Sequence, residues 1–206
     1  MRVLGIDEAG RGCVLGALYV GAFLTDDVHD DRLLEAGAAD SKALTPAKRL
    51  RARALLAELG KTQVLAIPAS AIDQGNLNTL EEDAIVALVK RWKPDRVVID
   101  ALGHPRTLPK VLARLQSRAR ATEWLMEPKA DALYPVVGAA SIFAKTDRDG
   151  ALMRLAEAHG DLGSGYPSDP TTKAWLAAHH ATGKPWPDFV RTKWATIQNL
   201  EHPELF

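Results

Sequence analysis

The first apolar run of the chain, residues 3–6, is short and ends directly in two adjacent carboxylates, Asp7 and Glu8. A run of this length and composition predicts a buried strand. A second run of the same kind, residues 96–99, ends in Asp100. We therefore expect a sheet whose strands carry acidic side chains at their ends.

The remaining apolar patterns predict further strands and several helices. We expect strands at residues 14–24, 63–67 and 123–126, and helices at residues 46–59, 78–92, 108–118, 134–159, 171–180 and 189–198. Asn78 or Thr79 can cap the second helix, and Gly150 can break the fourth. The order of elements predicts a mixed α/β fold, in which an antiparallel meander and parallel strands are flanked by helices and followed by a helical C-terminal region.

The balance of charged residues limits how the chain could bind a polyanionic partner. Lys plus Arg equals Asp plus Glu, 26 each, so the chain has no basic excess, and a polyanion would have to meet a local patch. One basic and aromatic stretch near the C-terminus contains Lys184, Trp186, Arg191, Lys193 and Trp194. It is either a duplex-binding patch or a set of core tryptophans beneath surface charges, and the sequence alone leaves both open.

Cys13 is the single cysteine of the chain, so no intrachain disulfide is possible and a reducing compartment is expected. We expect Cys13 to be a small packed residue, because no partner base is indicated. The apolar run at the N-terminus is too short for a signal peptide, and no run is long enough to span a membrane. The expected location is the cytoplasm, and no membrane partner is expected.

The acidic residues at strand ends suggest a metal site. Strand ends in an α/β sheet gather on one rim, so Asp7, Glu8 and Asp100 could converge there, and Asp131 after the fifth predicted strand could join them. Clustered carboxylates repel one another unless they share a cation, and Mg²⁺ or Mn²⁺ prefers oxygen ligands. Two such ions roughly 3.5–4 Å apart can hold the attacking water and the leaving oxygen of a phosphodiester. Acids at these places are also common as turn residues and caps, and spacing alone does not decide between the two interpretations.

The residues around these acids resemble a known family. Residues 5–12, Gly-Ile-Asp-Glu-Ala-Gly-Arg-Gly, resemble the opening motif of the type 2 ribonucleases H, and specifically ribonuclease HII. Six further segments follow in the order of that family, at residues 40–42, 76–81, 97–100, 129–145, 163–170 and 190–194. The resemblance covers nearly the whole chain.

The resemblance implies a ribonuclease H-like catalytic domain at residues 1–160 and a helical C-terminal region at residues 161–206 packed on it. It implies an endonuclease that hydrolyses the RNA strand of RNA–DNA hybrids and cuts at single ribonucleotides in duplex DNA during ribonucleotide removal. Such an enzyme uses two Mg²⁺ or Mn²⁺ ions and leaves a 5′-phosphate and a 3′-hydroxyl. The substrate would be the protein's partner, and a monomer is expected.

The resemblance also assigns roles to individual residues. The catalytic, metal-binding acids would be Asp7, Glu8, Asp100 and Asp131. The residues that read the RNA–DNA junction would be Gly10, Arg11, Gly12 and Tyr166. Further substrate contacts are expected from Lys42, Ser141 and Lys145. The chain departs from the usual family pattern at Cys13, where proline is usual, at Ala43, where lysine is frequent, and at Gly138, where serine is.

Three alternatives stay open at this point. Ribonuclease HIII is the nearest, although it carries an extra N-terminal domain and lacks this Gly-Arg-Gly. The others are another metal-dependent nuclease of the same fold class and a non-catalytic module that binds hybrids. We expect no sliding-clamp peptide, because Gln198 is wrongly spaced from Leu205 and Phe206.

Overall fold

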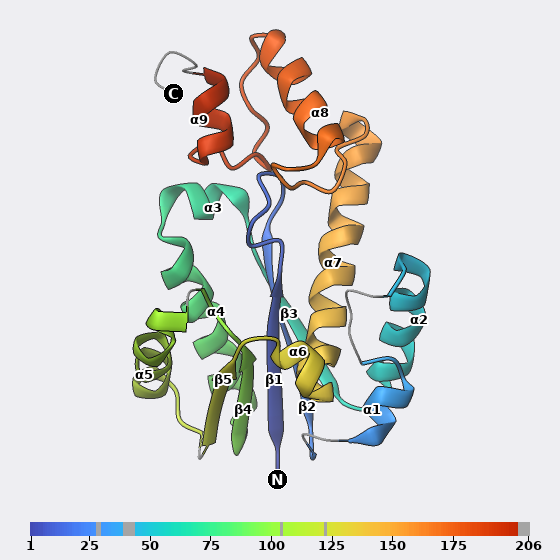
Figure 1. The fold of residues 1–206 in the computed structure, drawn as a ribbon, viewed down its shortest axis with the longest axis vertical. Helices are drawn as coiled ribbons and strands as arrows, with labels where there is room; N and C mark the ends of the chain where they lie inside the picture. Colours follow the sequence, from blue (N-terminus) through green and yellow to red (C-terminus); the bar gives the residue numbers. More distant parts are fainter. Residues whose placement is uncertain (28–29, 39–43, 104, 122, 202–206) are drawn as a thin grey trace.

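A central sheet of five strands forms the framework of the computed structural model, which describes residues 1–27, 30–38, 44–103, 105–121 and 123–201 (Figure 1). The strands lie in the order β3-β2-β1-β4-β5. Their bounds are β1 Val3–Ala9, β2 Leu18–Thr25, β3 Lys61–Ile67, β4 Arg96–Asp100 and β5 Glu123–Glu127. Strands β1, β2 and β3 pair antiparallel, whereas β4 pairs parallel with both β1 and β5. The predicted combination of an antiparallel meander with parallel strands is confirmed.

Helices cover both faces of this sheet (Figure 1). One face packs on α4 and α5, and the other on α7 with α1 and α2. The helices are α1 Asp31–Glu35, α2 Pro46–Ala57, α3 Ala69–Gln74, α4 Leu77–Trp92, α5 Leu108–Arg118, α6 Ala130–Leu133, α7 Pro135–His159, α8 Pro170–Ala181 and α9 Ala195–Glu201. Within the described ranges, no helix has the length and apolar character needed to cross a membrane.

Helix α7 lies unusually close to the sheet because glycines face it. A Cβ on Gly5 would lie 2.3 Å from the carbonyl oxygen of Val136, and one on Gly21 would lie 2.5 Å from that of Ala140. Both contacts are far shorter than packed atoms allow, so only glycine fits at these positions. The close approach brings the middle of α7 to the end of β1, where Asp7 lies.

The second half of α7 extends beyond the sheet and supports the C-terminal region, which contains α8 and α9 (Figure 1). Besides the two hydrophobic clusters on the faces of the sheet, a third hydrophobic cluster joins this region to the loop after β1. Its buried members are Val14, Leu15, Leu162, Leu176, Phe189, Val190 and Ile197. Trp186 and Trp194 are partly buried against this cluster, so the core interpretation of these two tryptophans is confirmed.

Two predicted boundaries are wrong for the same physical reason. Strand β2 begins at Leu18 and not at residue 14, and the last helix begins at Ala195 and not at residue 189. The two intervening segments bind each other, with a β-bridge between Leu15 and Val190 and a backbone hydrogen bond from Arg191 to Val14. Their backbone groups are thus satisfied by a partner distant in sequence.

Two details of the predicted helices are also wrong. Helix α4 is capped by Asn76, whose side chain accepts from the backbone of Thr79, and not by Asn78 or Thr79. Gly150 lies within α7 and does not break it. The cap at Asn76 leaves the side chain of Asn78 available for other contacts.

The two glycines of α7 should respond oppositely to alanine. A Cβ on Gly138 would lie 1.8 Å from the carbonyl oxygen of Ala38, whereas one on Gly150 would find only an ordinary contact, 3.5 Å from Nη1 of Arg154. We expect Gly138→Ala to lower the free energy of unfolding by about 1–3 kcal/mol through overpacking. Gly150→Ala should raise it by about 0.5–1 kcal/mol through better helix propensity. Urea denaturation measures both, and equal effects of the two substitutions would contradict the packing described.

Candidate active site

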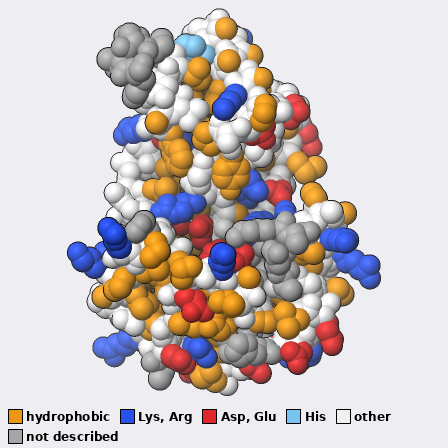
Figure 2. All heavy atoms as spheres, viewed as in Figure 1, with side chains coloured by type: hydrophobic (Ala, Val, Ile, Leu, Met, Phe, Trp, Pro, Cys, Tyr) orange, Lys and Arg blue, Asp and Glu red, His pale blue; other side chains and the backbone are white. Residues whose placement is uncertain are grey.

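The ends of β1 and β4 open into a pocket of about 170 Å³. Asp7 and Glu8 of β1 and Asp100 of β4 line it together, as the strand-end pattern predicts. The remaining lining residues are Ala9, Gly10, Arg11, Gly12, Lys145, Arg148 and Tyr166. Figure 2 shows acidic and basic side chains gathered across the middle of one face, below the C-terminal helices. The pocket thus combines carboxylates with cationic groups and one aromatic ring.

Asp7 is buried and held from both sides. The backbone N–H of Glu8 donates to its Oδ1 at 2.8 Å, and the hydroxyl of Ser141 donates to its side chain. Burial raises the pKa of Asp7, and the charge of Asp100 adds to that rise, whereas Ser141 and Lys145 oppose it. Ser141 is fully buried, so it contacts the acid and not the solvent.

Glu8 lies on the opposite face of β1 from Asp7, because side chains alternate along a strand. Burial raises the pKa of Glu8 well above its ordinary value, and the charges of Asp7 and Glu81 add to that rise. Its Oε2 atom is buried and has no hydrogen-bond partner among the described residues. A carboxylate oxygen in this state is stabilised by a cation.

Asp100 and Asp131 are linked through the turn that follows β5. The backbone N–H of Ala130 donates to Oδ1 of Asp100 at 2.8 Å. Lys129 begins this turn with φ +62°, in the left-handed region that is costly for a residue with a side chain. Asp131 is buried in α6, with its Oδ2 3.9 Å from Nζ of Lys145. Lys145 also interacts with Asp7, so Asp131 lies beside the same pocket.

The four acids have the donor chemistry that divalent ions prefer, but they do not form a complete, preformed set of ligands. All their donors are carboxylate oxygens, and burial, with a smaller contribution from neighbouring carboxylates, raises the pKa of Asp7 and of Glu8. Across the part of the chain that the structure describes, no three Asp, Glu, His or Cys side chains already stand close enough to hold one ion. Mg²⁺ normally keeps several waters as ligands, so a looser set of carboxylates suits it.

Residues 10–12 form a loop whose shape depends on Arg191. Gly10 has φ +83°, a conformation that favours glycine. The guanidinium of Arg191 donates to the carbonyl oxygens of Gly10 at 2.7 Å, Arg11 at 2.8 Å and Gly16 at 3.0 Å. Arg191 is fully buried, and burial lowers its pKa to about 10. Its planar fork thereby fixes three carbonyls, of which only that of Gly10 accepts another backbone bond, from the N–H of Cys13 at 3.3 Å.

The interpretation of the C-terminal basic stretch as a surface patch is therefore wrong for Arg191. Its charge points into the protein and holds a loop, because buried carbonyl groups need donors. The neighbouring Thr192 is anchored as well, with its N–H and hydroxyl both 2.7 Å from Oδ2 of Asp73 in α3. Lys184 and Lys193 are exposed.

Tyr166 lies in a loop that is shaped by Asp169. The carboxylate of Asp169 accepts from the N–H of Ser164 at 2.7 Å and that of Thr171 at 2.8 Å. The side-chain hydrogen bond from Ser164, together with these backbone bonds, lowers the pKa of Asp169 to about 2. The ring of Tyr166 packs where Gly12 lacks a side chain, since a Cβ there would lie 3.4 Å from the ring. Cys13 is buried, as expected for a packed residue, and interacts with the hydroxyl of Tyr166.

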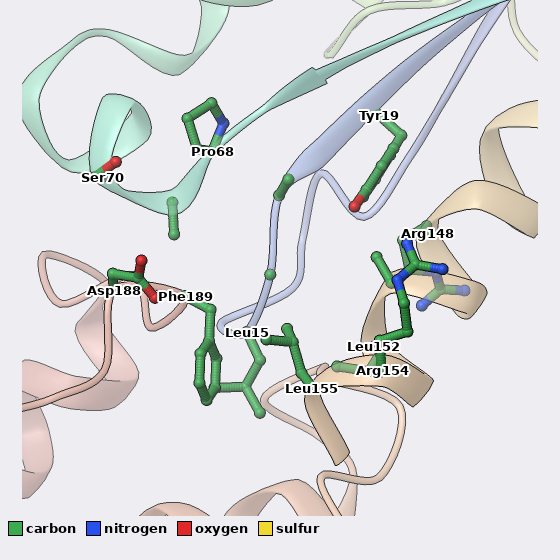
Figure 3. A pocket seen from close by; sticks show the side chains of 14 residues that line it. Leu15, Tyr19, Pro68, Ser70, Arg148, Leu152, Arg154, Leu155, Asp188 and Phe189 are labelled. Carbon is green, nitrogen blue, oxygen red and sulfur yellow. The ribbon is translucent and has the colours of Figure 1, made fainter. Parts of the chain in front are cut away.

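A larger cavity of about 360 Å³ lies next to this pocket, and Arg148 lines both (Figure 3). Leu15, Leu155 and Phe189 lie close together on one side of it, and Arg148, Leu152 and Arg154 project from α7 on the other. Its lining includes one acid, Asp188, and none of the four candidate catalytic acids. The candidate catalytic acids at the strand ends therefore belong to the smaller pocket and not to this cavity.

The structure brings together most of the residues that the sequence singled out. Asp7, Glu8, Asp100, Gly10, Arg11, Gly12, Lys145 and Tyr166 line one pocket, with Asp131 and Ser141 directly behind it. Lys42 and Ala43 lie outside the described residues. Sequence reasoning missed Arg191, Asp73 and Glu81. The role of Arg191 could have been inferred from its place directly after the apolar pair Phe189 and Val190, which suggests a buried arginine.

Comparison with known proteins decides the family. The model of the ribonuclease HII family matches residues 4–197. The chain belongs to the ribonuclease HII family. Ribonuclease HII of Pyrococcus horikoshii is 37% identical over 208 residues, which cover 98% of this chain and 93% of that protein. Members of the family hydrolyse the RNA strand of RNA–DNA hybrids, so the chain is a ribonuclease H.

Two solved structures agree with this membership. The crystal structure of ribonuclease H2 from Pyrococcus horikoshii OT3 superimposes with a TM-score of 0.88 at 35% identity, covering 98% of each chain. The ribonuclease HII of Archaeoglobus fulgidus, solved in complex with PCNA, gives a TM-score of 0.84 at 35% identity, covering 96% of each chain. The predicted ribonuclease H-like fold is confirmed, and the family is ribonuclease HII rather than ribonuclease HIII.

Arg191 and Lys193 form a matched pair of buried and exposed cations two residues apart. Arg191→Met removes the donors of the carbonyls of Arg11 and Gly16, and leaves that of Gly10 only the N–H of Cys13 at 3.3 Å, so we expect the free energy of unfolding to fall by about 2 kcal/mol or more. The same variant should lower kcat/KM, because the loop of residues 10–12 loses its shape. Lys193→Met should change stability by no more than about 0.5 kcal/mol. Denaturation and steady-state cleavage measure these effects, and an equally mild result for both variants would refute the role given to Arg191.

Proposed function

We propose that the chain is an endonuclease that cuts at single ribonucleotides embedded in duplex DNA as well as in longer RNA–DNA hybrids, in the service of ribonucleotide removal. The observation that carries this proposal is one pocket in which Asp7, Glu8 and Asp100 adjoin the Gly-Arg-Gly loop and Tyr166. Acids alone would suit many phosphodiesters. The adjoining loop and ring supply the means to distinguish a ribonucleotide.

Divalent metal dependence is general for the family. We propose that Asp7, Glu8, Asp100 and Asp131 hold two Mg²⁺ or Mn²⁺ ions. When bound, these ions supply the positive charge that stabilises the phosphodiester under attack by water. The raised pKa values of Asp7 and Glu8 support this role, because neighbouring carboxylates without a cation favour their protonated forms.

Ser141 and Lys145 of α7 support the acids in this proposal. The hydroxyl of Ser141 orients the side chain of Asp7 through a hydrogen bond. The ammonium of Lys145 lies 3.9 Å from Asp131 and interacts with Asp7, so it balances part of the negative charge. Lys145 also lines the pocket, from which it can approach a phosphate of the substrate.

Recognition of the ribonucleotide is proposed for Gly10, Arg11, Gly12 and Tyr166. Glycines let main-chain groups approach a sugar closely, and the 2′-hydroxyl is the group that distinguishes RNA from DNA at one site. Arg11 would hold a phosphate, and Tyr166 would stack on the sugar of the next deoxynucleotide. Water as the nucleophile would leave a 5′-phosphate and a 3′-hydroxyl.

Protein partners and the oligomeric state are proposed separately from the substrate. The relative from Archaeoglobus fulgidus was solved in complex with PCNA. For this chain we propose a monomer without a recognisable sliding-clamp peptide. Gln198 lies within α9, and Leu205 and Phe206 lie outside the described residues.

The test is cleavage of a DNA duplex that contains one ribonucleotide, with an all-DNA duplex of the same sequence as control. With Mg²⁺ or Mn²⁺ we expect a cut at the ribonucleotide and none in the control. Asp7→Asn should lower kcat by about a thousandfold or more while leaving the fold intact, since a metal ligand is lost. Cleavage of the all-DNA duplex would favour another nuclease of this fold class. If neither duplex is cut, with Mg²⁺ or with Mn²⁺, the result would favour a non-catalytic binding module.

A further inference from the structure

Arg11, the charged residue of the Gly-Arg-Gly loop, is held by two side chains of α4. Its Nη2 atom donates to Oδ1 of Asn78 and lies 3.3 Å from Oε2 of Glu81. Asn78 and Glu81 are three residues apart and so project from one face of the helix. A rigid element that is remote in sequence from the loop therefore sets the direction of the guanidinium.

Packing alone does not account for Glu81. Its side chain is only 1% exposed, whereas that of Arg11 is 26% exposed. Its Oε1 atom has no hydrogen-bond partner among the described residues, and burial raises its pKa to about 7 although Arg11 opposes the rise. Burying a carboxylate that is only partly paired costs stability. A residue kept at such a cost is a candidate for a role in the reaction.

Arg11 has a competing partner in Glu8. Both side chains line the same pocket, and the charge of Arg11 opposes the rise that burial causes in the pKa of Glu8. An arginine that paired with Glu8 would neutralise a proposed metal ligand and withdraw from the substrate. Glu81 provides an alternative carboxylate for Arg11 and leaves Glu8 open.

The position in which Arg11 is held suits a nucleic acid backbone. Arg11 lines both the catalytic pocket and an adjoining cavity of about 340 Å³. Asn78, Glu81, Glu82, Lys110 and Arg114 line this second cavity as well. The guanidinium therefore stands between the catalytic acids and a hollow that carries two further cationic side chains, Lys110 and Arg114, and a phosphodiester chain carries the opposite charge.

We propose that Glu81 is a positioning residue for Arg11, which it directs toward the substrate backbone and away from Glu8. Glu81 does not touch the reacting atoms. Its effect falls on substrate binding and passes entirely through the guanidinium of Arg11. The inference rests on the proposed substrate-binding role of Arg11.

Asp83 is a control on the same helix. Its side chain is 51% exposed and pairs with Arg118 of α5, and it lies outside the lining of the cavity that Arg11 borders. Asp83→Asn therefore removes a carboxylate charge two residues from Glu81 without touching Arg11.

The experiment is a double-mutant cycle on the DNA duplex with one ribonucleotide, comparing wild type, Arg11→Ala, Glu81→Gln and the double variant. We expect Glu81→Gln to raise KM about tenfold and to change kcat by less than about twofold, since a charge-assisted contact is lost. In the Arg11→Ala background the same change should have no further effect on KM. Asp83→Asn should leave KM unchanged. Asn78→Ala should shift KM in the same direction as Glu81→Gln. Because Asn78 is exposed, its substitution should not disturb folding, so it tests the positioning of Arg11 even if Glu81→Gln folds poorly.

The outcomes separate the two levels of the proposal. If Arg11→Ala leaves KM unchanged, the substrate-binding role of Arg11 fails and the role of Glu81 fails with it. If Arg11→Ala raises KM but Glu81→Gln does not, or if their effects multiply, Glu81 is not the positioning residue and the proposed function stands. A higher Mg²⁺ concentration for half-maximal activity in Glu81→Gln, with KM unchanged, would assign Glu81 to the metal site and overturn the inference.

Discussion

Buried carboxylates that repel one another are the constraint on which this structure depends. Asp7 and Glu8 end one strand and Asp100 ends its parallel neighbour, so the sheet itself forces the three charges together. Burial raises the pKa of both β1 acids, and Glu8 keeps a buried oxygen without a partner among the described residues. A fold that gathers charge in this way gains stability only when cations join it. The hydroxyl and ammonium groups that α7 brings to the acids offset part of the repulsion.

The loop of residues 10–12, for which we propose recognition of the ribonucleotide, depends on elements far away in the chain. The buried fork of Arg191 fixes its carbonyls, and Glu81 and Asn78 of α4 hold the side chain of Arg11. The loop thus joins the catalytic sheet to the C-terminal region, and the third hydrophobic cluster closes the same junction. This arrangement explains why residues 14–17 do not continue β2: their backbone groups pair with the C-terminal segment instead.

The sequence predicts the fold and the acids better than it predicts what holds the loop. Apolar runs that end in acids are local patterns, and the edge of a parallel pair brings such ends together, so Asp7 and Asp100 could be placed in advance. The role of Arg191 could not, because an arginine near tryptophans suggests a surface patch until its partners are known. Those partners are backbone carbonyls of residues 10–16, which have no side-chain signature. Glu81 was similarly hidden, because an acid in a helix is ordinary until a guanidinium is found beside it.

The most direct test of the metal site is the thermal stability of the wild type and of Asp7→Asn, each with and without saturating Mn²⁺. Binding to the native state should raise the Tm of the wild type by about 5 °C or more, whereas Asp7→Asn should lose most of that shift. Without metal, Asp7→Asn should melt no lower than the wild type, because it removes one of the buried, mutually repelling charges. An undiminished Mn²⁺ shift in Asp7→Asn, or a clearly lower Tm without metal, would contradict the account.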